Sequence, residues 1–403
     1  MKYFPCAITA AALANCLGNT ADEVFRNAIA GADCFATSDE VFPGLPFRVP
    51  VGLMKAPPKR PTDFPWKGAE TRLFRVVHAS AVQLKAPVES AVARWGKDRV
   101  SYVFASSTGG LEHTEDTVSR GAVTPIAKGE TTSTLLADHS MHATNDDMAN
   151  YLGIGGYRYV VTTACSSSLK ALKSAVRLIE SGLADAVLVG CGDSLCRTTL
   201  YGFRSLGILP DAPTRPFSAD RAGLTLGEGS AFVLLERTPK PGVHPLAWLS
   251  GIGESSDAFH PSSPDPTGKG ALASMREALA TAGLAPTDID HVAAHGTGTL
   301  QNDTMESAAI HTVFPGIPVT ATKSLTGHTL GAAGLTSLVL SLESLRLQTC
   351  LPTLRSEPTD PTVANPIVKT ATPRSMTHVL VNSFAFGGNN CSAVISRAGG
   401  TAP

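Results

Sequence analysis

Cys165 lies where the residue types change from those of a strand to those of a helix. Residues 160–161 are β-branched and apolar, small residues follow, and leucines and alanines recur at helical spacing from residue 169. We therefore expect the sulfur at the first turn of a helix, where unpaired N–H groups and the helix dipole favour a thiolate. A helix start contributes about 0.3–1 kcal/mol, so it moves a thiol pKa by roughly one unit from about 8.5. A catalytic Cys165 needs further partners.

Three other stretches could supply those partners, because each combines polar groups with a predicted element end. They hold, in chain order, His295 with Thr297 and Thr299, then Lys323 with His328, and finally Phe386 in a glycine-rich run. Each also has a structural explanation: a histidine at a strand end commonly satisfies hydrogen bonds, and the glycines fit turns or a β-bulge. Together they provide a nucleophile, two imidazoles, an ammonium group and free backbone N–H groups. That combination is typical of acyl transfer.

The elements that position these residues follow a repeated order. Strands are predicted over 99–107, 184–192 and 230–236, and again over 246–252, 292–294, 319–322 and 379–381, with helices after Cys165 and over 270–282 and 330–347. The run 239–241 (Pro-Lys-Pro) marks an internal boundary. We therefore expect a pseudo-duplicated α/β fold. Residues 1–240 would hold the nucleophile with cap and dimer insertions, and 241–403 both histidines and the glycine-rich loop.

The first 150 residues are less regular. Residues 6–17 follow Lys2 as in a signal peptide, but the capping-box spacing of Thr20 and Glu23 before a helix over 24–30 favours a retained core strand. Residues 40–68 predict an irregular surface excursion, and helices are expected over 70–84 and 88–95. Residues 111–150 are polar and weakly periodic, so we expect a long cap or subunit-contact region there.

Composition excludes several classes of protein. The 403 residues are 43% hydrophobic and 17% charged, which suits one large α/β domain or two packed ones. The net charge of −1 gives no reason to expect nucleic acid or an anionic membrane as partner, and no stretch is expected to span a bilayer. The eight cysteines form no C-x-x-C pair, so buried free thiols are expected rather than disulfides or a metal site. A cytoplasmic enzyme is the default.

The motifs resemble those of the β-ketoacyl-acyl carrier protein synthases, ketosynthases with the thiolase fold. The matching runs are Thr-Ala-Cys-Ser-Ser-Ser, His-Gly-Thr-Gly-Thr, Lys-Ser-x-x-Gly-His-x-x-Gly-Ala-Ala-Gly and Asn-Ser-Phe-x-Phe-Gly-Gly-x-Asn, in the family's order. The similarity extends from the first strand to about residue 395 and is weakest over 40–150. It implies two βαβαβαββ halves in a layered α/β/α/β/α architecture.

The resemblance also implies a role for each residue. Cys165 would carry an acyl chain taken from the phosphopantetheine of an acyl carrier protein, and His295 and His328 would assist decarboxylation of a malonyl thioester and stabilise its enolate. Lys323 would support the histidines, with Glu306 as its counter-charge. The backbone N–H groups of Cys165 and Phe386 would form an oxyanion hole, and Phe386 would also gate the acyl pocket. Thr297 and Thr299 would bind the pantetheine arm. Neither a metal nor a bound cofactor is implied.

Two residues depart from the family's pattern. Ala385 stands where a glycine is common, and Ser337 stands where the helix after the second histidine often carries a glutamate. The first departure bears on the mobility of the gate, and the second on the support of Lys323.

Several alternatives stay open at this point. A non-catalytic chain-length-factor-like partner subunit is the main one, although such partners typically lack the cysteine; a thiolase or initiating synthase fits two histidines less well. The pathway is type II fatty-acid or polyketide, including aryl polyene, biosynthesis, and the assembly a homodimer or a heterodimer with a chain-length factor. Because carrier proteins are acidic, a basic rim is expected near the pocket, with Arg204 and residues 55–60 as candidates.

Overall fold

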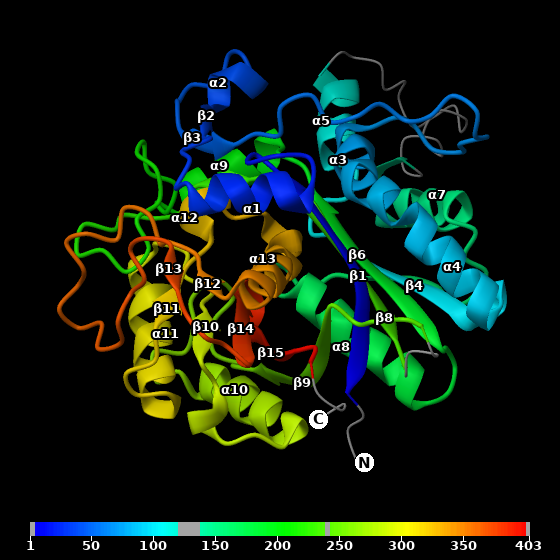
Figure 1. Ribbon diagram of the computed structural model, residues 1–403. Helices are drawn as coiled ribbons and strands as arrows, with labels where there is room; N and C mark the ends of the chain where they lie inside the picture. The colour runs from blue at the N-terminus through cyan, green and yellow to red at the C-terminus, as the bar shows by residue number, and fades with distance from the viewer. Residues whose placement is uncertain (1–4, 120–137, 238–241, 400–403) are drawn as a thin grey trace.

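Two five-stranded sheets are joined edge to edge in the computed structural model, which describes residues 5–119, 138–237 and 242–399 (Figure 1). The strand order is β11-β10-β14-β15-β9-β1-β8-β6-β4-β5. At the junction, β1 and β9 pair antiparallel over three residue pairs, from Cys6 with Leu249 to Ile8 with Ala247. The first sheet contains β1 (Cys6–Asn15), β4 (Val100–Ala105), β5 (Arg158–Val161), β6 (Ala186–Asp193) and β8 (Gly229–Glu236). The second contains β9 (Ala247–Ser256), β10 (His291–Ala293), β11 (Val319–Thr320), β14 (His378–Ala385) and β15 (Asn389–Arg397).

The two sheets have the same topology. When the strands of each half are numbered in chain order, both sheets read third, second, fourth, fifth, first, with the same succession of parallel and antiparallel pairs. This confirms the pseudo-duplicated fold. The expected boundary between residues 240 and 241 lies in 238–241, outside the described residues, so the division into 1–240 and 241–403 stays a prediction.

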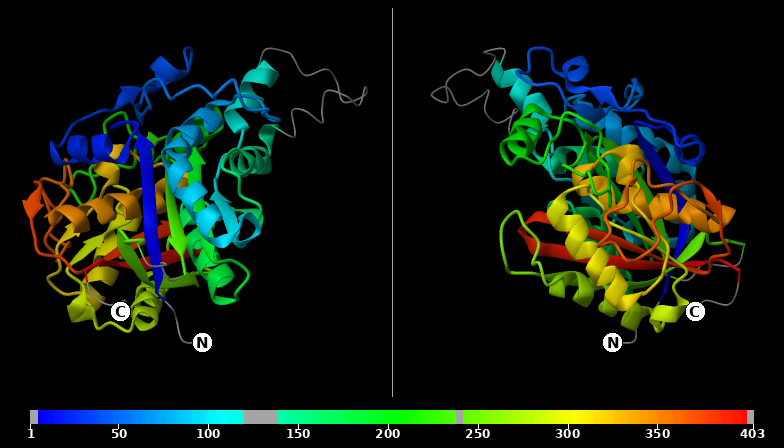
Figure 2. Two further views of the ribbon diagram at one scale, coloured as in Figure 1. Left: turned by 45° about the vertical axis from the view of Figure 1, so that its right-hand side comes forward. Right: turned by 90° about the vertical axis from the view of Figure 1, so that its left-hand side faces the viewer.

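Helices complete the five layers (Figure 1). The outer face of the first sheet is covered by α3 (Arg72–Ala81), α4 (Lys85–Trp95) and α7 (Met141–Tyr151). The outer face of the second is covered by α10 (Lys269–Ala282) and α11 (Leu300–Val313). Between the sheets lie α8 (Ser167–Glu180) and α13 (Ala333–Leu347), with α1 (Ala21–Ile29) packed on the same core. Figure 2 shows β1, in blue, running steeply across the red strands β14 and β15.

The middle helices are apolar because both sheets contact them. Helix α13 is buried almost all round, and a Cβ at Gly334 would lie 2.7 Å from Leu169 Cγ of α8, so the glycine permits the close crossing. The 18 residues Leu330–Leu347 are long and apolar enough to span a bilayer, contrary to our expectation. Since 83% of this segment is buried inside the protein, it is accounted for as a core helix.

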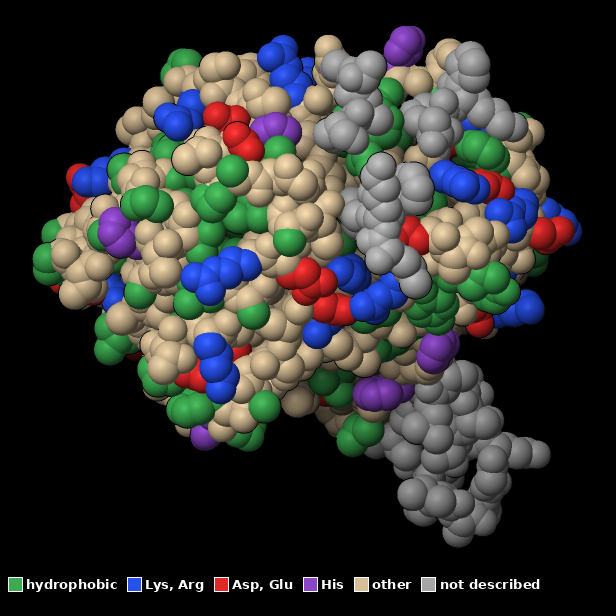
Figure 3. All heavy atoms as spheres, turned by 90° about the horizontal axis from the view of Figure 1, so that it is seen from below, with side chains coloured by type: hydrophobic (Ala, Val, Ile, Leu, Met, Phe, Trp, Pro, Cys, Tyr) green, Lys and Arg blue, Asp and Glu red, His purple; other side chains and the backbone are tan. Residues whose placement is uncertain are grey.

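The remaining elements are small. They are a three-stranded sheet of β2 (Ala36–Thr37), β3 (Pro50–Gly52) and β7 (Leu226–Gly227), a pair β12 (Thr349–Cys350) and β13 (Thr372–Pro373), and helices α2 (Ser38–Val41), α5 (Leu111–Ser119), α9 (Arg197–Ser205) and α12 (Lys323–Thr326). The expected cap over 111–150 contains α5 and α7, and its residues 120–137 lie outside the described residues. Seven of the eight cysteines are buried, and no disulfide bond joins any of them in the described part of the chain. On the face seen from below, basic and acidic side chains are interspersed (Figure 3).

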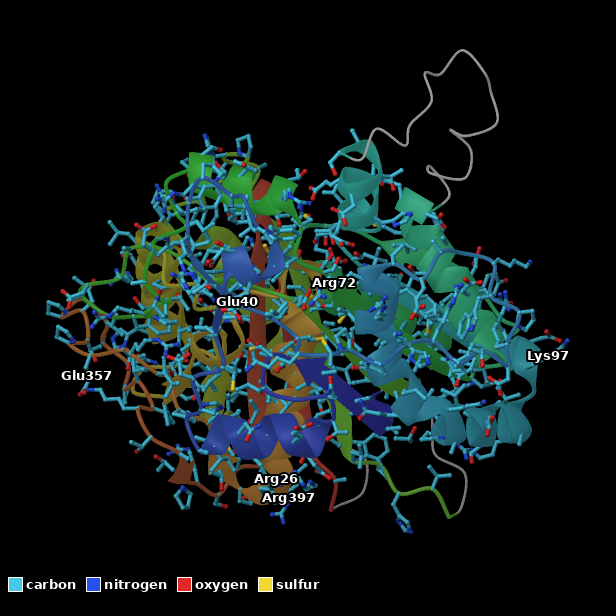
Figure 4. All side chains as sticks on the ribbon, turned by 90° about the horizontal axis from the view of Figure 1, so that it is seen from above. Arg26, Glu40, Arg72, Lys97, Glu357 and Arg397 are labelled. Atoms are coloured by element: carbon cyan, nitrogen blue, oxygen red, sulfur yellow. The ribbon has the colours of Figure 1, made fainter. Side chains whose placement is uncertain are left out.

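A buried ion pair ties the small sheet to the rest of the molecule. Glu228 follows β7 and is fully buried; its carboxylate accepts hydrogen bonds from the backbone N–H groups of Met54 (2.9 Å) and Leu195 (3.2 Å). Arg72 of α3 donates to both of its oxygens, through Nε at 2.8 Å and through Nη2. Arg72 lies well inside the outline in Figure 4, whereas Lys97 and Glu357 lie at its edges.

Replacing Arg72 by Met should therefore destabilise the protein by about 3–5 kcal/mol, because it leaves the buried Glu228 carboxylate without its counter-charge. Thermal unfolding of the two proteins measures the effect. The control is Arg48→Met, since Arg48 pairs with Asp39 on the surface, where the side chains are 70% and 47% exposed. Equal melting temperatures for Arg72→Met and Arg48→Met would contradict the prediction.

Candidate active site

Cys165 lies in the turn between β5 and α8, ahead of the first helical residue, Ser167. The preceding residue, Ala164, has φ +52°, a left-handed conformation that side chains disfavour. Its carbonyl accepts hydrogen bonds from Ser107 Oγ (3.1 Å) and from the backbone N (3.1 Å) and Oγ (2.6 Å) of Ser167, which hold the turn. Cys165 is 6% exposed and lies at the junction of strand and helix, as expected, two residues before the first helical residue.

His328 is the nearest partner of the sulfur. Its Nε2 lies 3.1 Å from Cys165 Sγ. The backbone N–H of Leu330 donates to Nδ1 at 3.1 Å, so the ring proton belongs on Nε2 and points towards the sulfur. Two backbone bonds fix the residue: His328 N donates to Thr225 O (2.7 Å), and Gly227 N donates to His328 O (2.9 Å).

His295 is held by Lys323. Lys323 Nζ lies 3.1 Å from His295 Nδ1 and also donates to the His295 carbonyl. A protonated lysine can only donate, so the proton of His295 also belongs on Nε2. The two imidazole rings are 5.5 Å apart at 86°, and both line one pocket with Cys165. The site therefore presents two Nε2–H donors beside one thiol.

Burial decides the charge of these groups. It lowers the pKa of both His295 and His328 well below 6.5, and the Lys323 cation lowers them further, so both rings are neutral at neutral pH. Burial raises the pKa of Cys165 to about 11. Lys323 and the backbone N–H groups of Phe386 and Cys165 itself favour the thiolate and so lower this pKa, but by less than burial raises it. Burial also lowers the pKa of Lys323 to about 8, opposed chiefly by Glu306.

Two buried carboxylates at the start of α11 hold the loop that follows His295. Glu306 accepts from the backbone N of His295 (2.7 Å) and of Gly296 (2.8 Å), and from the side-chain amides of Asn302 and Asn382. Within the described chain no salt bridge joins Glu306 to Lys323, so the expected counter-charge acts through its field instead of by contact. Burial raises the pKa of Glu306, whereas its backbone hydrogen bonds lower it.

The second carboxylate, Asp303, orients the two threonines predicted to bind pantetheine. It accepts from the backbone N of Thr297 at 3.0 Å. The hydroxyls of Thr297 and Thr299 are 2.9 Å apart, and both residues line the pocket that contains Cys165. The structure thus brings the two threonines to the approach towards the sulfur.

Phe386 closes the other side of the pocket. Its ring stacks on Phe203 of α9, with centroids 5.7 Å apart, and its backbone N–H favours the thiolate of Cys165. Ala385 has φ −125° and ψ 154°, ordinary extended backbone, so no glycine is required there. The left-handed residues of the loop are Gly387 (φ +78°) and Gly388 (φ +72°).

A second groove adjoins the pocket and shares Ile208, Thr299 and Phe386 with it. The expected basic rim is not found among the described residues that line this groove. Arg221 is the one Lys or Arg among them, and it forms a largely buried salt bridge with Asp360. Arg204 lies beside the pocket residue Phe203 but is paired with Asp211 (2.7 Å). In the described chain, none of residues 55–60 lines the groove or the pocket.

Sequence reasoning missed some residues that shape the site. They are Asp193, Phe203, Asn302 and Asn382. The position of Asp193 at the end of a predicted buried strand was the available signal, since a carboxylate there must be satisfied by neighbouring donors.

Alkylation of Cys165 should be slow at neutral pH, because burial keeps the thiol protonated. We expect the rate with iodoacetamide to rise about tenfold per pH unit between about pH 6 and pH 9.5 without levelling off. Mass spectrometry of the peptide containing Cys165 gives the rate, with N-acetylcysteine as the reference thiol. A plateau near neutral pH would contradict the prediction.

Two family models match the chain: the β-ketoacyl synthase N-terminal domain over residues 90–240 and the C-terminal domain over residues 246–357. Among curated relatives, 3-oxoacyl-[acyl-carrier-protein] synthase 2 of Rhizobium meliloti (strain 1021) is 37% identical over 258 residues, 60% of this chain. The chain spans about 61% of the length of that relative.

Solved structures extend the similarity over the whole fold. A chain of the ketosynthase (ApeO) complex with its chain length factor (ApeC) from Xenorhabdus doucetiae has a TM-score of 0.85 and 34% identity, over 98% of both chains. A β-ketoacyl synthase from Burkholderia phymatum STM815 has a TM-score of 0.82 and 26% identity, over 98% of this chain and 100% of the other. The family models, the curated relative and the shared fold agree with the motifs: the chain belongs to the β-ketoacyl synthase family of the thiolase superfamily.

Proposed function

We propose that the protein is an elongating ketosynthase, an acyltransferase that joins an acyl chain on Cys165 to malonyl-acyl carrier protein by decarboxylative Claisen condensation. The observation that carries the proposal is the Cys165–His328 contact of 3.1 Å, with His295 in the same pocket and held there by Lys323. Family membership and the name of the curated relative support it.

In the first step the Cys165 thiolate attacks the thioester carbonyl of an acyl carrier protein. The new C–S bond pushes the carbonyl electrons onto oxygen, and the backbone N–H groups of Cys165 and Phe386 are suited to stabilise that oxyanion. Collapse expels the phosphopantetheine thiolate, which takes up one proton in exchange for the proton that the Cys165 thiol released when it became a thiolate. Three donors around the sulfur, including His328 Nε2–H, offset part of the burial that opposes thiolate formation.

In the second step a malonyl thioester loses CO2, and the electrons of the broken C–C bond form an enolate. Neutral imidazoles suit this step, because an Nε2–H can donate to the enolate oxygen without first losing a charge. Lys323 keeps His295 in that tautomer. The enolate carbon then attacks the acyl-Cys165 carbonyl and expels the thiolate, which leaves a β-ketoacyl carrier protein. Every group used is a side chain or backbone group of this chain, so the proposal needs no cofactor.

The non-catalytic partner subunit is not favoured, because the nucleophile and both histidines are present and in contact. We propose instead that the protein works with a partner of that kind or with a second copy. Strand β5 supports this, since it ends the sheet and all four of its residues are partly exposed. The similarity to the complex of ApeO with its chain length factor ApeC supports a partner of that kind, and with such a partner we propose a polyene or polyketide pathway. We place the enzyme in the cytoplasm as part of the same proposal.

Acyl transfer to Cys165 tests the proposal. Incubation with an acyl-acyl carrier protein should add one acyl group to the peptide that contains Cys165, as measured by mass spectrometry. Cys165→Ala should abolish the adduct and the condensation product, because no other described thiol lines the pocket. Cys34→Ser, at a partly exposed cysteine outside the pocket, is the control. Unchanged condensation in Cys165→Ala would refute the elongation proposal.

Decarboxylation should slow above about pH 8. Burial lowers the pKa of Lys323 to about 8, so rising pH removes the positive charge of Lys323 and weakens its hydrogen bond to His295. We expect CO2 release by enzyme already acylated on Cys165 to fall through this range, which separates the effect from thiol ionisation. Lys323→Met should lower the rate about 10²-fold at pH 7 and remove the alkaline decline. An unchanged decline in Lys323→Met would assign it to another group.

A further inference from the structure

Arg355 has no part in the motifs, yet its guanidinium reaches the segment that carries Lys323. It donates through Nη2 to the carbonyl of Ser324, through Nε to the carbonyl of Thr214 (3.2 Å), and through Nη1 to Asp33 Oδ2 (2.9 Å). The side chain is only 23% exposed, and its cation lies 5.3 Å from the ring centroid of Phe35. Arg355 thus contacts Ser324 and Thr214 near the site on one side and the more exposed Asp33 on the other.

The contact with Ser324 stabilises the end of a very short helix. Helix α12 contains only four residues, Lys323–Thr326, so its last carbonyls lack donors within the helix. A cation at a helix C-terminus satisfies such a carbonyl and also interacts favourably with the helix dipole. Arg355 does this one residue after Lys323, the residue whose Nζ holds His295.

The residues before Arg355 hold the same segment from the same side. Thr353 Oγ1 accepts from the backbone N of Ala321 (2.9 Å), and the backbone N of Leu354 donates to Ser324 Oγ (2.9 Å). Ala321 in turn packs against the residue after His295, because a Cβ at Gly296 would lie 2.5 Å from Ala321 Cβ. Displacement of residues 321–324 would therefore move both partners of the Lys323–His295 contact.

The contact with Thr214 leads to the second histidine. Thr214 Oγ1 donates to the carbonyl of Thr297 (2.8 Å), and Thr214 N donates to Thr225 Oγ1 (2.9 Å). Thr225 O accepts the backbone N–H of His328 at 2.7 Å. Two hydrogen-bonded residues, Thr214 and Thr225, thus connect the Arg355 guanidinium to His328.

The backbone of Arg355 is itself constrained, with φ +59° in the left-handed region. A residue with a Cβ rarely adopts this conformation unless its surroundings hold it there. The backbone turn at Cys165 is held separately by Ser107, Ser167 and Ser383. Along the path described above, Arg355 reaches the sulfur only through His328, beyond two intervening threonines. Arg355 therefore bears on the decarboxylation groups and not on the oxyanion hole for acyl transfer.

We infer that Arg355 is a positioning residue for decarboxylation, which holds Lys323 and His295 in register through Ser324. This role of Arg355 rests on the proposed function and adds that the two reaction steps depend on different positioning contacts. Groups around Cys165 serve acyl transfer, and the contact of Arg355 with Ser324 serves the second step through Lys323 and His295.

Arg355→Met, which keeps most of the side-chain volume, tests this by separating the two steps. We expect CO2 release from malonyl-acyl carrier protein by the acylated enzyme to fall about tenfold to 10²-fold, as for a modest misplacement of catalytic groups. The single-turnover rate of Cys165 acylation should stay within about twofold of the unaltered protein. Arg355→Lys should restore part of the loss, because one ammonium can bond the Ser324 carbonyl but lacks the guanidinium's second arm.

The matched control is Arg215→Met. Arg215 donates to the carbonyls of Arg355 and Glu357 and, within the described residues, makes no hydrogen bond to α12, so both rates should be unchanged. Equal slowing of both steps in Arg355→Met, no slowing of CO2 release, or the same slowing in Arg215→Met would each overturn the inference. If the unaltered protein accepts no acyl group on Cys165, the proposed function itself fails, and that outcome is distinct from these three.

Discussion

The carboxylate of Asp193 fixes the two turns that meet at Cys165. One oxygen accepts from Ser106 Oγ (2.7 Å), Ser107 N (2.8 Å), and both the N (2.8 Å) and Oγ1 (2.7 Å) of Thr108; the other accepts from Gly331 N (2.7 Å). A buried carboxylate requires such satisfaction, since each missing donor would leave an uncompensated charge. Ser107 then holds Ala164, while Gly331 lies three residues after His328. The 3.1 Å contact between cysteine and histidine depends on this joint between the two halves of the chain.

Desolvation, not the helix dipole, dominates the electrostatics of the site. A helix start favours a thiolate by about 0.3–1 kcal/mol. Burial raises the pKa of Cys165 from 9.0 to about 11, a net change of about 3 kcal/mol in the opposite direction. The site therefore holds a neutral thiol and two neutral imidazoles around one buried cation, Lys323. This composition suits chemistry in which charge develops only in the transition state, because fixed N–H donors need not reorganise when the oxyanion forms.

The sequence predicts elements well where one face is apolar and fails where function places polar groups inside. The strands of both halves except β15, and the helices α8, α10 and α13, follow from hydrophobic pattern, and the motifs predict Cys165, His295 and His328. Helix α11 gives no such pattern because its buried face carries Asp303 and Glu306, which hold the His295 loop. The left-handed turn at Ala164 and the reach of Arg355 depend on tertiary contacts, which residue spacing does not encode.

The two departures from the family's pattern have different consequences. Ala385 is extended, so the turning of the gate loop falls on Gly387 and Gly388 and the alanine leaves it intact. Ser337 bonds Thr322 Oγ1 at 2.8 Å, one residue before Lys323, and supplies a neutral hydroxyl where a carboxylate is common. With Glu306 engaged by backbone N–H groups, no carboxylate contacts the ammonium directly among the described residues. The lysine is held by the ring and carbonyl of His295 instead, so its orientation depends on the backbone of residues 321–324 more than on a counter-ion.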